Sequence, residues 1–464
     1  MRAGVGPGLA GLLLALLVCA CSTDAPPPST DPLPAPSSAP PASRAPSGPP
    51  TTEPLLLVTH HSRGDLDVLL SLARRIAAGR VDTWHRIDGT GEPLRLVRRP
   101  ARVRSDRDAL AVVPASRAGP LVRAVAVAGV DPWGDPAAYP LQVPGPAPGE
   151  VTTLRLLGDI MLGRRVAAVS PADDPVAALR PLARHLRSAD LTVGNLESTL
   201  STAGPPRQGS DSFAVDPAVA DGLVQLGVDA VSLANNHSGD FGDLALTRTV
   251  RRLREAGLPA FGAGRDLAAA SRPVVLRHRG VRFGFLGFNA IGETPAAAPG
   301  RPGALSVRMP PRTGPLSEVD LARVELLVRD LSRRVDVVVV LPHWGTQYTH
   351  RAEPVQRLVA RRLAAAGADL VVGGHPHWVQ GLERAGDAVV AHSLGNLVFD
   401  MDFMEQTLEG ITLTATFWGD RLVSVVPAAY RMDDRFAPRL LRGDAARDVL
   451  ADVWAHSTGP FAAR

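Results

Sequence analysis

The chain has 464 residues, of which 45% are hydrophobic and 21% charged, so it can bury several cores and is not an intrinsically disordered protein. Its formal net charge is only +4, because 50 basic residues, all of them arginine, face 46 acidic ones. No long run of basic residues occurs, so nothing supports nucleic-acid binding, and the basic balance at most favours an anionic substrate or surface.

Residues 1–20 have the pattern of a signal peptide. A positive charge at Arg2 precedes the apolar stretch 9–18, which is too short to span a bilayer. The stretch leads into residues 17–21, with the sequence LVCAC, which resembles the lipobox of bacterial lipoproteins. The alternative is an ordinary signal peptide with incidental cysteines. Cleavage before Cys21 would leave a single cysteine, so we expect the mature protein to have no disulfides. We also expect it to lie outside the cytoplasm, anchored to the cell membrane by lipid on Cys21.

Two further segments precede the main domain. Residues 21–53 are mostly proline, serine, alanine and threonine, which is typical of an extended tether. Residues 54–142 predict a small α/β module that loosely resembles a lobe of solute-binding proteins. Its expected elements are strands over 54–59, 110–114 and 122–130 and an amphipathic helix over 65–78. Residues 143–150, rich in proline and glycine, are expected to form a linker.

Residues 151–430 are expected to form the main domain, because polar clusters follow strong apolar strands there again and again. The apolar strands are 154–157, 190–193, 228–233, 335–341 and 368–372. In α/β sheets the loops beyond the carboxyl ends of the strands line one rim. We therefore expect these polar clusters to gather around a common point and to form a site.

The polar clusters supply oxygen and imidazole donors and no thiolate. The candidate metal ligands are Asp159, Glu197, Asn236, His343, His375 and His377. Such a set suits one or two first-row divalent ions, Mn, Fe or Zn, in a hydrolytic centre, and Glu197 can bridge two cations. His375 and His377 are expected on one extended segment, where side chains two apart share a face.

The same residues belong to motifs with a fixed order along the chain. The motifs are Gly158-Asp159-x-Met161-Leu162, Asn195-Leu196-Glu197, Asn235-Asn236-His237 with Asp240, His343-Trp344-Gly345, Gly374-His375-Pro376-His377 with Gln380, and Ser393-Leu394-Gly395-Asn396. Together they resemble the CapA-type capsule synthesis family, named for poly-gamma-glutamate capsule biosynthesis and similar to the calcineurin-like metallophosphoesterases. The resemblance covers residues 154–400. It implies a four-layer α/β sandwich, with two mixed β-sheets packed face to face between helices.

The resemblance also implies a role for single residues. The six donors named above would bind metal, with Glu197 as the bridging carboxylate. His237 would protonate a leaving oxygen or stabilise the transition state. Asp240 would either orient His237 or simply form a turn. The residues expected to line the pocket are Asn195, Asn235, Trp344, Gln380, Ser393 and Asn396.

The chain departs from the family pattern at two positions. Met161 stands where the wider superfamily has a metal-binding histidine, which would remove a ligand from one ion. Gln347 stands before Tyr348 where the family usually has glutamate, which removes a charge from the rim. A mononuclear and a dinuclear centre therefore both stay open.

Three functions fit these observations. The favoured one is a cell-surface protein of capsule or surface-polymer biosynthesis with a phosphoesterase-like hydrolase site, acting on a phosphoester or an anionic polymer such as polyglutamate. The second is a non-catalytic accessory that binds surface polymer and aids its export or attachment, with the capsule export machinery as a partner. The third is a solute-binding lipoprotein. Met161 argues against the first function, and the retained histidines argue for it.

The C-terminal part predicts a hairpin and a helix. Residues 411–417 and 422–427 are expected to pair as antiparallel strands and to complete the second sheet. Residues 431–464 form a last segment, in which 445–455 predict a closing helix.

Overall fold

The computed structural model describes residues 51–147 and 149–462. The predicted signal peptide, Cys21 and nearly all of the predicted tether lie outside the described residues. Among the helices that are described, none has the length and apolarity needed to cross a membrane.

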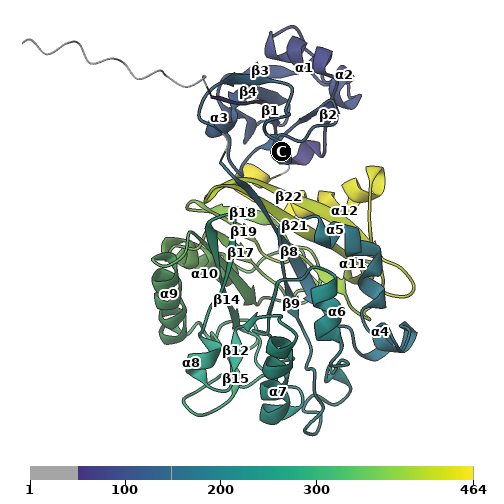
Figure 1. Cartoon of the computed structure of the whole chain (residues 1–464), viewed down its shortest axis with the longest axis vertical. Coiled ribbons are helices and arrows are strands. Elements are labelled where there is room, and N and C mark those ends of the chain that lie inside the picture. The colour runs from purple at the N-terminus through teal and green to yellow at the C-terminus, as the bar shows by residue number, and fades with distance from the viewer. Residues whose placement is uncertain (1–50, 148, 463–464) are drawn as a thin grey trace, which may run out of the picture. The chain divides into compact units, whose positions relative to one another are not determined.

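The small N-terminal module is a mixed α/β unit (Figure 1). Its elements are β1 (Thr52–Thr59), β2 (Asp67–Val68), α1 (Leu70–Ala77), α2 (His85–Asp88), β3 (Arg95–Val97), α3 (Pro100–Val103), β4 (Ala109–Pro114), β5 (Arg123–Ala124), β6 (Ala126–Val127) and β7 (Gln142–Pro144). The strands predicted over 54–59 and 110–114 are confirmed as β1 and β4, which pair antiparallel. Their side chains are buried on both faces, because α1 and α3 contribute to the same apolar core.

Two predictions for this module were wrong. The helix expected over 65–78 begins only at Leu70, because Asp67 and Val68 form a strand that pairs with β6. The strand expected over 122–130 is divided into β5 and β6. Its first part pairs with β1 and its second part with β2, so the one predicted strand contributes to two sheets.

The first sheet of the main domain carries three of the six candidate ligands, Asp159, Glu197 and Asn236, on or just beyond its strands. Its strands are β8 (Val151–Ile160), β9 (Leu191–Leu196), β10 (Ala230–Ser232), β11 (Ala260–Phe261), β20 (Asn396–Val398), β21 (Glu409–Trp418), β22 (Arg421–Met432) and β23 (Pro438–Leu440). The spatial order is β11-β10-β9-β8-β21-β22-β23, with β20 also paired to β8. The predicted hairpin is confirmed as β21 and β22. It extends this first sheet rather than the second, because Leu413 of β21 pairs with Leu156 of β8.

The second sheet has the order β13-β14-β16-β17-β19-β18. Its strands are β13 (Val274–His278), β14 (Val281–Asn289), β16 (Val337–His343), β17 (Leu370–Val372), β18 (Leu382–Ala385) and β19 (Ala388–Ala391). The central strands β14, β16, β17 and β19 are parallel, and both edge strands are antiparallel, so the sheet is mixed. A separate short ladder joins β12 (Ala263–Gly264) and β15 (Gly303–Ala304).

The helices cover the two sheets from outside (Figure 1). They are α4 (Arg164–Val169), α5 (Ala183–Arg187), α6 (Val219–Gln225), α7 (Gly242–Glu255), α8 (Leu267–Ala270), α9 (Glu318–Ser332), α10 (Pro354–Ala365), α11 (Glu405–Leu408) and α12 (Gly443–His456). Local chemistry starts the longer ones: the Ser317 hydroxyl caps α9, and α10 begins with a capping box between Glu353 and Gln356. The closing helix predicted over 445–455 is confirmed as α12.

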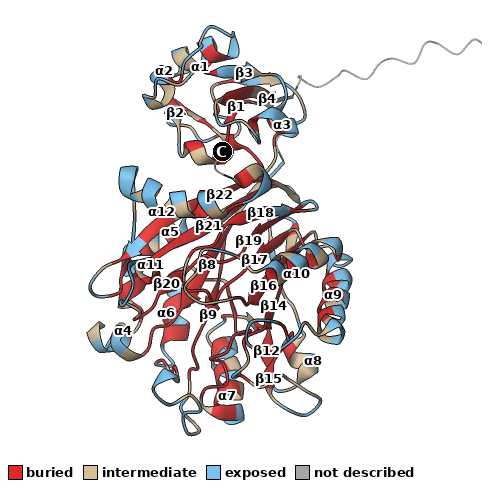
Figure 2. Ribbon diagram, turned by 180° about the vertical axis from the view of Figure 1, so that it is seen from behind, coloured by how far each residue is buried: buried red, intermediate tan, exposed pale blue. Residues whose placement is uncertain are grey.

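Strand β16 shows how the core is divided, because successive side chains of a strand point to opposite faces. Val337 and Val339 join an apolar cluster that also contains Leu154, Leu156 and Leu413 of the first sheet, so the two sheets face each other across it. Val338 and Val340 join a different cluster, built with α9 and α10. Figure 2 shows the buried residues concentrated in the sheets between exposed helix faces. The main domain is therefore a mixed α/β fold with several mixed sheets.

His61 of the small module predicts a pH dependence of stability. Its ring is buried against Trp454 and Phe461, and its Nε2 lies 2.9 Å from the carbonyl oxygen of Pro120. Burial, helped by the charge of Arg123, lowers the pKa of His61 from 6.5 to about 3. Only the unfolded chain then takes up a proton below pH 6.5, so stability from this group is complete above pH 6.5 and falls as the pH decreases toward 3.

We expect His61 to reduce the free energy of unfolding by about 2 kcal/mol between pH 6.5 and 4.5, since each pH unit well below 6.5 contributes about 1.4 kcal/mol and the ring of the unfolded chain is already half protonated at pH 6.5. Urea unfolding at both pH values measures this difference. His61→Gln keeps a donor for the Pro120 carbonyl but does not titrate, so its loss of stability over this range should be smaller by the same amount. An equal loss in both proteins would show that His61 does not carry the effect.

Candidate metal centre

Strand ends from both sheets bring the candidate ligands together. In the first sheet, parallel strands β8, β9 and β10 end beside Asp159, Glu197 and Asn236. In the second sheet, β16 ends at His343, and β17 ends just before the loop that carries His375. The polar clusters predicted to share one rim therefore meet where the carboxyl ends of parallel strands from both sheets converge.

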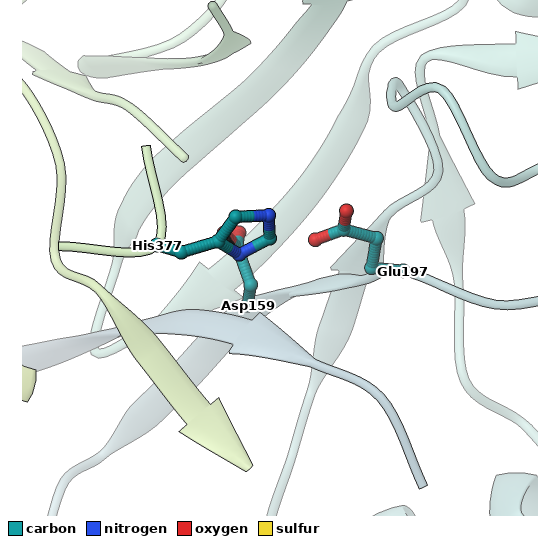
Figure 3. Close-up of side chains that lie close together, drawn as sticks. All are labelled: Asp159, Glu197 and His377. Atoms are coloured by element: carbon teal, nitrogen blue, oxygen red, sulfur yellow. Dashed lines mark ion pairs between the residues drawn. The ribbon is translucent and has the colours of Figure 1, made fainter. Parts of the chain in front are cut away.

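Asp159, Glu197 and His377 form the centre of this group. Each offers one ligand atom, and the three atoms lie within 4.8 Å of one another. All three side chains are buried, and Figure 3 shows them directed toward a common space. His377 Nδ1 lies 2.8 Å from the Asn396 side-chain oxygen, which can only accept, so Nδ1 carries the proton and Nε2 is left as an acceptor. This group can hold a metal ion.

Glu197 and His375 carry buried polar atoms that have no hydrogen-bond partner among the described residues. These atoms are both carboxylate oxygens of Glu197 and both ring nitrogens of His375. A buried polar atom without a partner costs about 1–3 kcal/mol, so such atoms are rare unless a ligand completes them. Burial, assisted by the charge of His343, lowers the pKa of His375 well below its ordinary value. The ring is therefore neutral, which is the form that binds metal.

The carboxylates and imidazoles of the centre depend on each other for charge. Burial raises the pKa of Asp159, and the charge of Glu197 adds to this effect. Burial acts in the same direction on Glu197, but the nearby histidines, above all His343, outweigh it and lower the pKa of Glu197 to about 2. Conversely, burial acts to lower the pKa of His343, and Glu197 and Asp159 raise it overall. A bound cation would balance the negative charges of Asp159 and Glu197, so the histidine rings would not need to be protonated.

A second set of donors also lies close to Glu197. His343 Nε2 is 2.8 Å from Asn236 Oδ1 and 3.6 Å from Glu197 Oε1, so one ion can reach all three atoms. The His343 and His375 rings are in edge contact, with centroids 5.0 Å apart. Glu197 thus lies near two sets of donors, Asp159 with His377 and Asn236 with His343, and the His375 ring lies close to both histidines.

Asn195 and Asn235 hold the ligands in place. Asn195 Nδ2 donates to Asp159 Oδ1 at 2.8 Å, and Asn235 Nδ2 donates to Asn195 Oδ1 at 2.9 Å. The backbone N–H of His375 donates to the other oxygen of Asp159 at 3.0 Å. Both oxygens of Asp159 are therefore oriented before any ion binds.

His237 is hydrogen-bonded to Asp240, which fits the orienting role that was one of the two alternatives for Asp240. His237 Nδ1 lies 2.8 Å from Asp240 Oδ2, and the backbone N–H of Phe213 donates to the same oxygen at 2.6 Å. His237 Nε2 then faces the centre, 3.7 Å from Glu197 Oε1. Phe213 stacks on the His237 ring, with centroids 3.7 Å apart. The sequence prediction missed Gln208, whose side-chain N–H donates to Asp240 Oδ1, because it lies in a loop outside every motif.

A pocket of about 400 Å³ opens over the histidines. Five non-glycine residues that line it have positive φ angles: Arg164 (48°), Glu293 (50°), Tyr348 (60°), His375 (95°) and His377 (60°). Such angles cost free energy and gather at functional sites. The expectation of an extended 375–377 segment was wrong, because left-handed angles at His375 and His377 turn the chain and bring the ring centroids to 5.7 Å. Gln347 also lines this pocket.

The other residues expected in the pocket divide into two groups. Asn396 contacts the centre through His377. Trp344 is buried in the core outside the second sheet, where its Nε1 donates to the His392 carbonyl. Gln380 donates to the carbonyls of Thr349 and Arg351, and Ser393 Oγ accepts the N–H of Gly395. Trp344, Gln380 and Ser393 thus serve packing and backbone bonding.

Met161 is buried in the apolar cluster with Phe213 and Val166, where its sulfur accepts the N–H of Gly163.

The absence of a side chain at Gly374 is expected to be important for metal affinity. A Cβ atom at this position would lie 2.4 Å from Asp159 Oδ1 and 3.4 Å from His343 Nδ1. We expect Gly374→Ala to displace Asp159 and to weaken divalent-ion affinity by about 10–100-fold, the range found when ligand orientation is lost. Titration calorimetry with Mn²⁺ measures this. Gly119→Ala, where an added Cβ meets open space, should bind as the parent protein does, and unchanged affinity in Gly374→Ala would contradict this geometry.

The sequence matches known proteins over this same region. Residues 153–401 match the model of the bacterial capsule synthesis protein family PGA_cap. The chain is 29% identical over 256 residues to a capsule biosynthesis protein CapA of Bacillus anthracis, covering 54% of this chain and 60% of the relative. It is 28% identical to a PGA biosynthesis protein CapA of Bacillus subtilis, covering 54% of this chain and 64% of the relative. It is likewise 28% identical to a probable polyglutamine synthesis accessory protein of Mycobacterium tuberculosis, covering 54% of this chain and 76% of the relative.

The chain thus spans under two thirds of the length of the two CapA relatives. The family match covers more than half of the chain, and it contains every candidate ligand described above. The chain therefore belongs to the CapA-type bacterial capsule synthesis protein family.

Proposed function

We propose that this protein is a metal-dependent hydrolase of phosphoesterase type that serves capsule or surface-polymer biosynthesis. The observation that carries the proposal is the set of unpartnered buried atoms on Glu197 and His375, beside the ligand atoms of Asp159, Glu197 and His377. These are the donors that a divalent cation would complete. We also infer that the two sheets and their helices form the four-layer sandwich of the metallophosphoesterases, since one apolar cluster lies between the sheets and others lie outside them.

The ion would be Mn, Fe or Zn, because the donors are carboxylate, amide and imidazole groups. Asn236, His343 and His375 complete one set with Glu197. The other set has Asp159 and His377, and Met161 offers it no ligand because its side chain is buried in the core. One firmly held ion and a second, weaker one fit this asymmetry. A divalent ion there supplies a Lewis acid and makes a nucleophile available at neutral pH.

The chain's own groups handle the proton. The Asp240 carboxylate accepts from His237 Nδ1 and so stabilises the ring when it is charged, with Nε2–H aimed toward the centre. From this position Nε2 gives its proton to the leaving oxygen, as a general acid. Phe213 excludes water from one face of the ring, and Gln208 keeps Asp240 in place. The positive φ angles of His375 and His377 hold both rings in the orientation that the centre needs.

The substrate class and the location remain part of the proposal. A phosphoester, or an amide-linked anionic polymer of the polyglutamate kind, suits the centre and the names of the relatives. A lipid on Cys21 would anchor the protein outside the cytoplasm at the cell membrane, and the tether would place the domain near capsule export machinery.

A second function has its own support. One relative is named an accessory protein, and Met161 contributes no ligand. The alternative is a non-catalytic accessory that binds surface polymer and aids its export or attachment.

Elemental analysis of the purified full chain, together with turnover of a chromogenic phosphodiester and of a glutamyl peptide, tests the enzyme proposal. We expect about one to two Mn, Fe or Zn ions for each chain. His375→Ala should lose both metal and turnover, whereas His85→Ala, an exposed histidine of the small module, should keep both. Metal binding without turnover of either substrate would overturn the enzyme proposal and leave the accessory function.

A further inference from the structure

The pocket over the metal centre has charged walls. Three arginines line it, and three carboxylates accompany them; these residues are Arg164, Arg165, Arg312, Asp211, Glu293 and Asp400. None of them belongs to a motif of the family pattern quoted above. Their charges cancel formally, so recognition depends on which ion pairs can open.

Arg312 is the arginine with the most freedom. Among the described residues it forms a single ion pair, with Glu293 at 2.5 Å, and its side chain is 47% exposed. A guanidinium has five N–H groups, so most of its donors stay available. Arg312 lines the same pocket as His375. It therefore combines uncommitted donors with a position beside the centre.

Arg164 is fixed. Two of its nitrogens bind the carboxylate of Asp400, whose side chain is only 2% exposed, and its guanidinium lies 4.5 Å from the centre of the Phe213 ring. The remaining contact, with the exposed Asp211, is long at 3.4 Å. Since Phe213 stacks on His237, Arg164 provides a positive charge on the His237 side of the pocket. Arg312 provides one on the His375 side.

We propose that Arg312, supported by Arg164, makes this pocket selective for a substrate that carries an anionic group besides the group that reacts. The proposal rests on the proposed function only for the identity of the reacting group. A carboxylate or phosphate of a repeating polymer accepts a two-pronged pair of hydrogen bonds from the Arg312 guanidinium. A neutral amide in the same place cannot replace the Glu293 carboxylate, so a neutral polymer binds less well.

Glu293 competes with an anionic ligand for the Arg312 guanidinium. It occupies Arg312 in the free protein, and its own side chain is 24% exposed at the pocket. An anionic ligand must displace it, whereas Asp400 is buried and stays in place. Removal of the Glu293 charge should therefore strengthen anion binding, and removal of the Arg312 charge should weaken it. If this ion pair served only to stabilise the fold, we would not expect removal of its two partners to change anion affinity in opposite directions.

Binding to the metal-free full chain, measured by calorimetry in low-salt buffer, tests the proposal without turnover. The ligands are pentaglutamate, pentaglutamine of equal length and a short glycerol phosphate chain. We expect pentaglutamate or the phosphate chain, or both, to bind at least tenfold more tightly than pentaglutamine, and the better ligand identifies the anion. Arg312→Gln should weaken anion binding about tenfold, and Glu293→Gln should strengthen it severalfold.

Arg361→Gln on α10 is the matched control, because it removes the same charge from an exposed position away from the pocket. Equal affinity for the charged and the neutral peptide, or equal effects of Arg312→Gln and Arg361→Gln, would overturn the proposal. Absence of turnover with selective anion binding would instead sink the hydrolase and leave this inference standing.

Discussion

Replacement of Glu197 by glutamine should abolish both metal binding and hydrolysis. Glu197 is the carboxylate that both donor sets share, and neither of its oxygens has a hydrogen bond among the described residues. A neutral amide cannot balance a cation here, and its N–H₂ group would face one. We expect divalent-ion affinity to fall by at least about 100-fold, more than for loss of a residue that only orients ligands. Turnover should fall by at least about 1,000-fold, the upper range for one electrostatic stabiliser.

Thermal unfolding with and without Mn²⁺ provides an independent measurement of this effect. A ligand at 100 times its dissociation constant stabilises the folded state by about 2.7 kcal/mol, so the parent protein should melt several degrees higher with metal. Glu197→Gln should show no such rise. Glu383→Gln removes another buried carboxylate, one that pairs with Arg357 outside the centre, so it should melt lower but keep its response to metal. A full response to Mn²⁺ in Glu197→Gln would refute the metal centre.

Replacement of His237 by asparagine should remove the general acid and leave the metal centre in place. His237 Nε2 faces the centre and its Nδ1 is held by Asp240, so the loss concerns proton transfer. We expect kcat to fall by about 10²–10⁴-fold for a substrate with an alkoxide leaving group. A nitrophenolate leaves without a proton, so the fall should be far smaller with that substrate. KM and Mn²⁺ affinity should change little.

Asp240→Asn completes this test. The amide cannot stabilise a charged His237 ring, so this variant should show the same dependence on the leaving group with a smaller loss. Kinetics with the two substrates separates acid catalysis from a general loss of shape. An equal loss with both leaving groups would mean that His237 only maintains the structure of the pocket.

Local patterns predicted several of the elements well. Strands β1 and β4, the β21–β22 hairpin and helix α12 carry strong apolar periodicity, and each was found where the pattern placed it. Short runs failed. Residues 122–130 are apolar apart from Arg123, and the periodicity could not reveal that β5 and β6 pair with different partners, because pairing depends on residues far away in the chain.

The sequence also could not predict the direction in which side chains of the loops point. Trp344 follows His343 directly, yet it points into the core outside the second sheet, because neighbours at a strand end face opposite ways. Gln208 and Arg312 lie in loops without any motif, and their contacts with Asp240 and Glu293 are formed only when those loops fold over the centre. No local signal distinguishes them from the many other arginines and polar loop residues of this chain.

The sequence by itself determined the family and the residue types of the candidate site, because the types of these residues and their order after apolar strands are local properties of the chain. Only the tertiary structure decided that the ligands come from two sheets, that left-handed angles at His375 and His377 turn both rings into the centre, and that Arg312 stands at its mouth. These features depend on contacts between residues distant in sequence, and the free energy that fixes them comes from packing and burial, which no local pattern encodes.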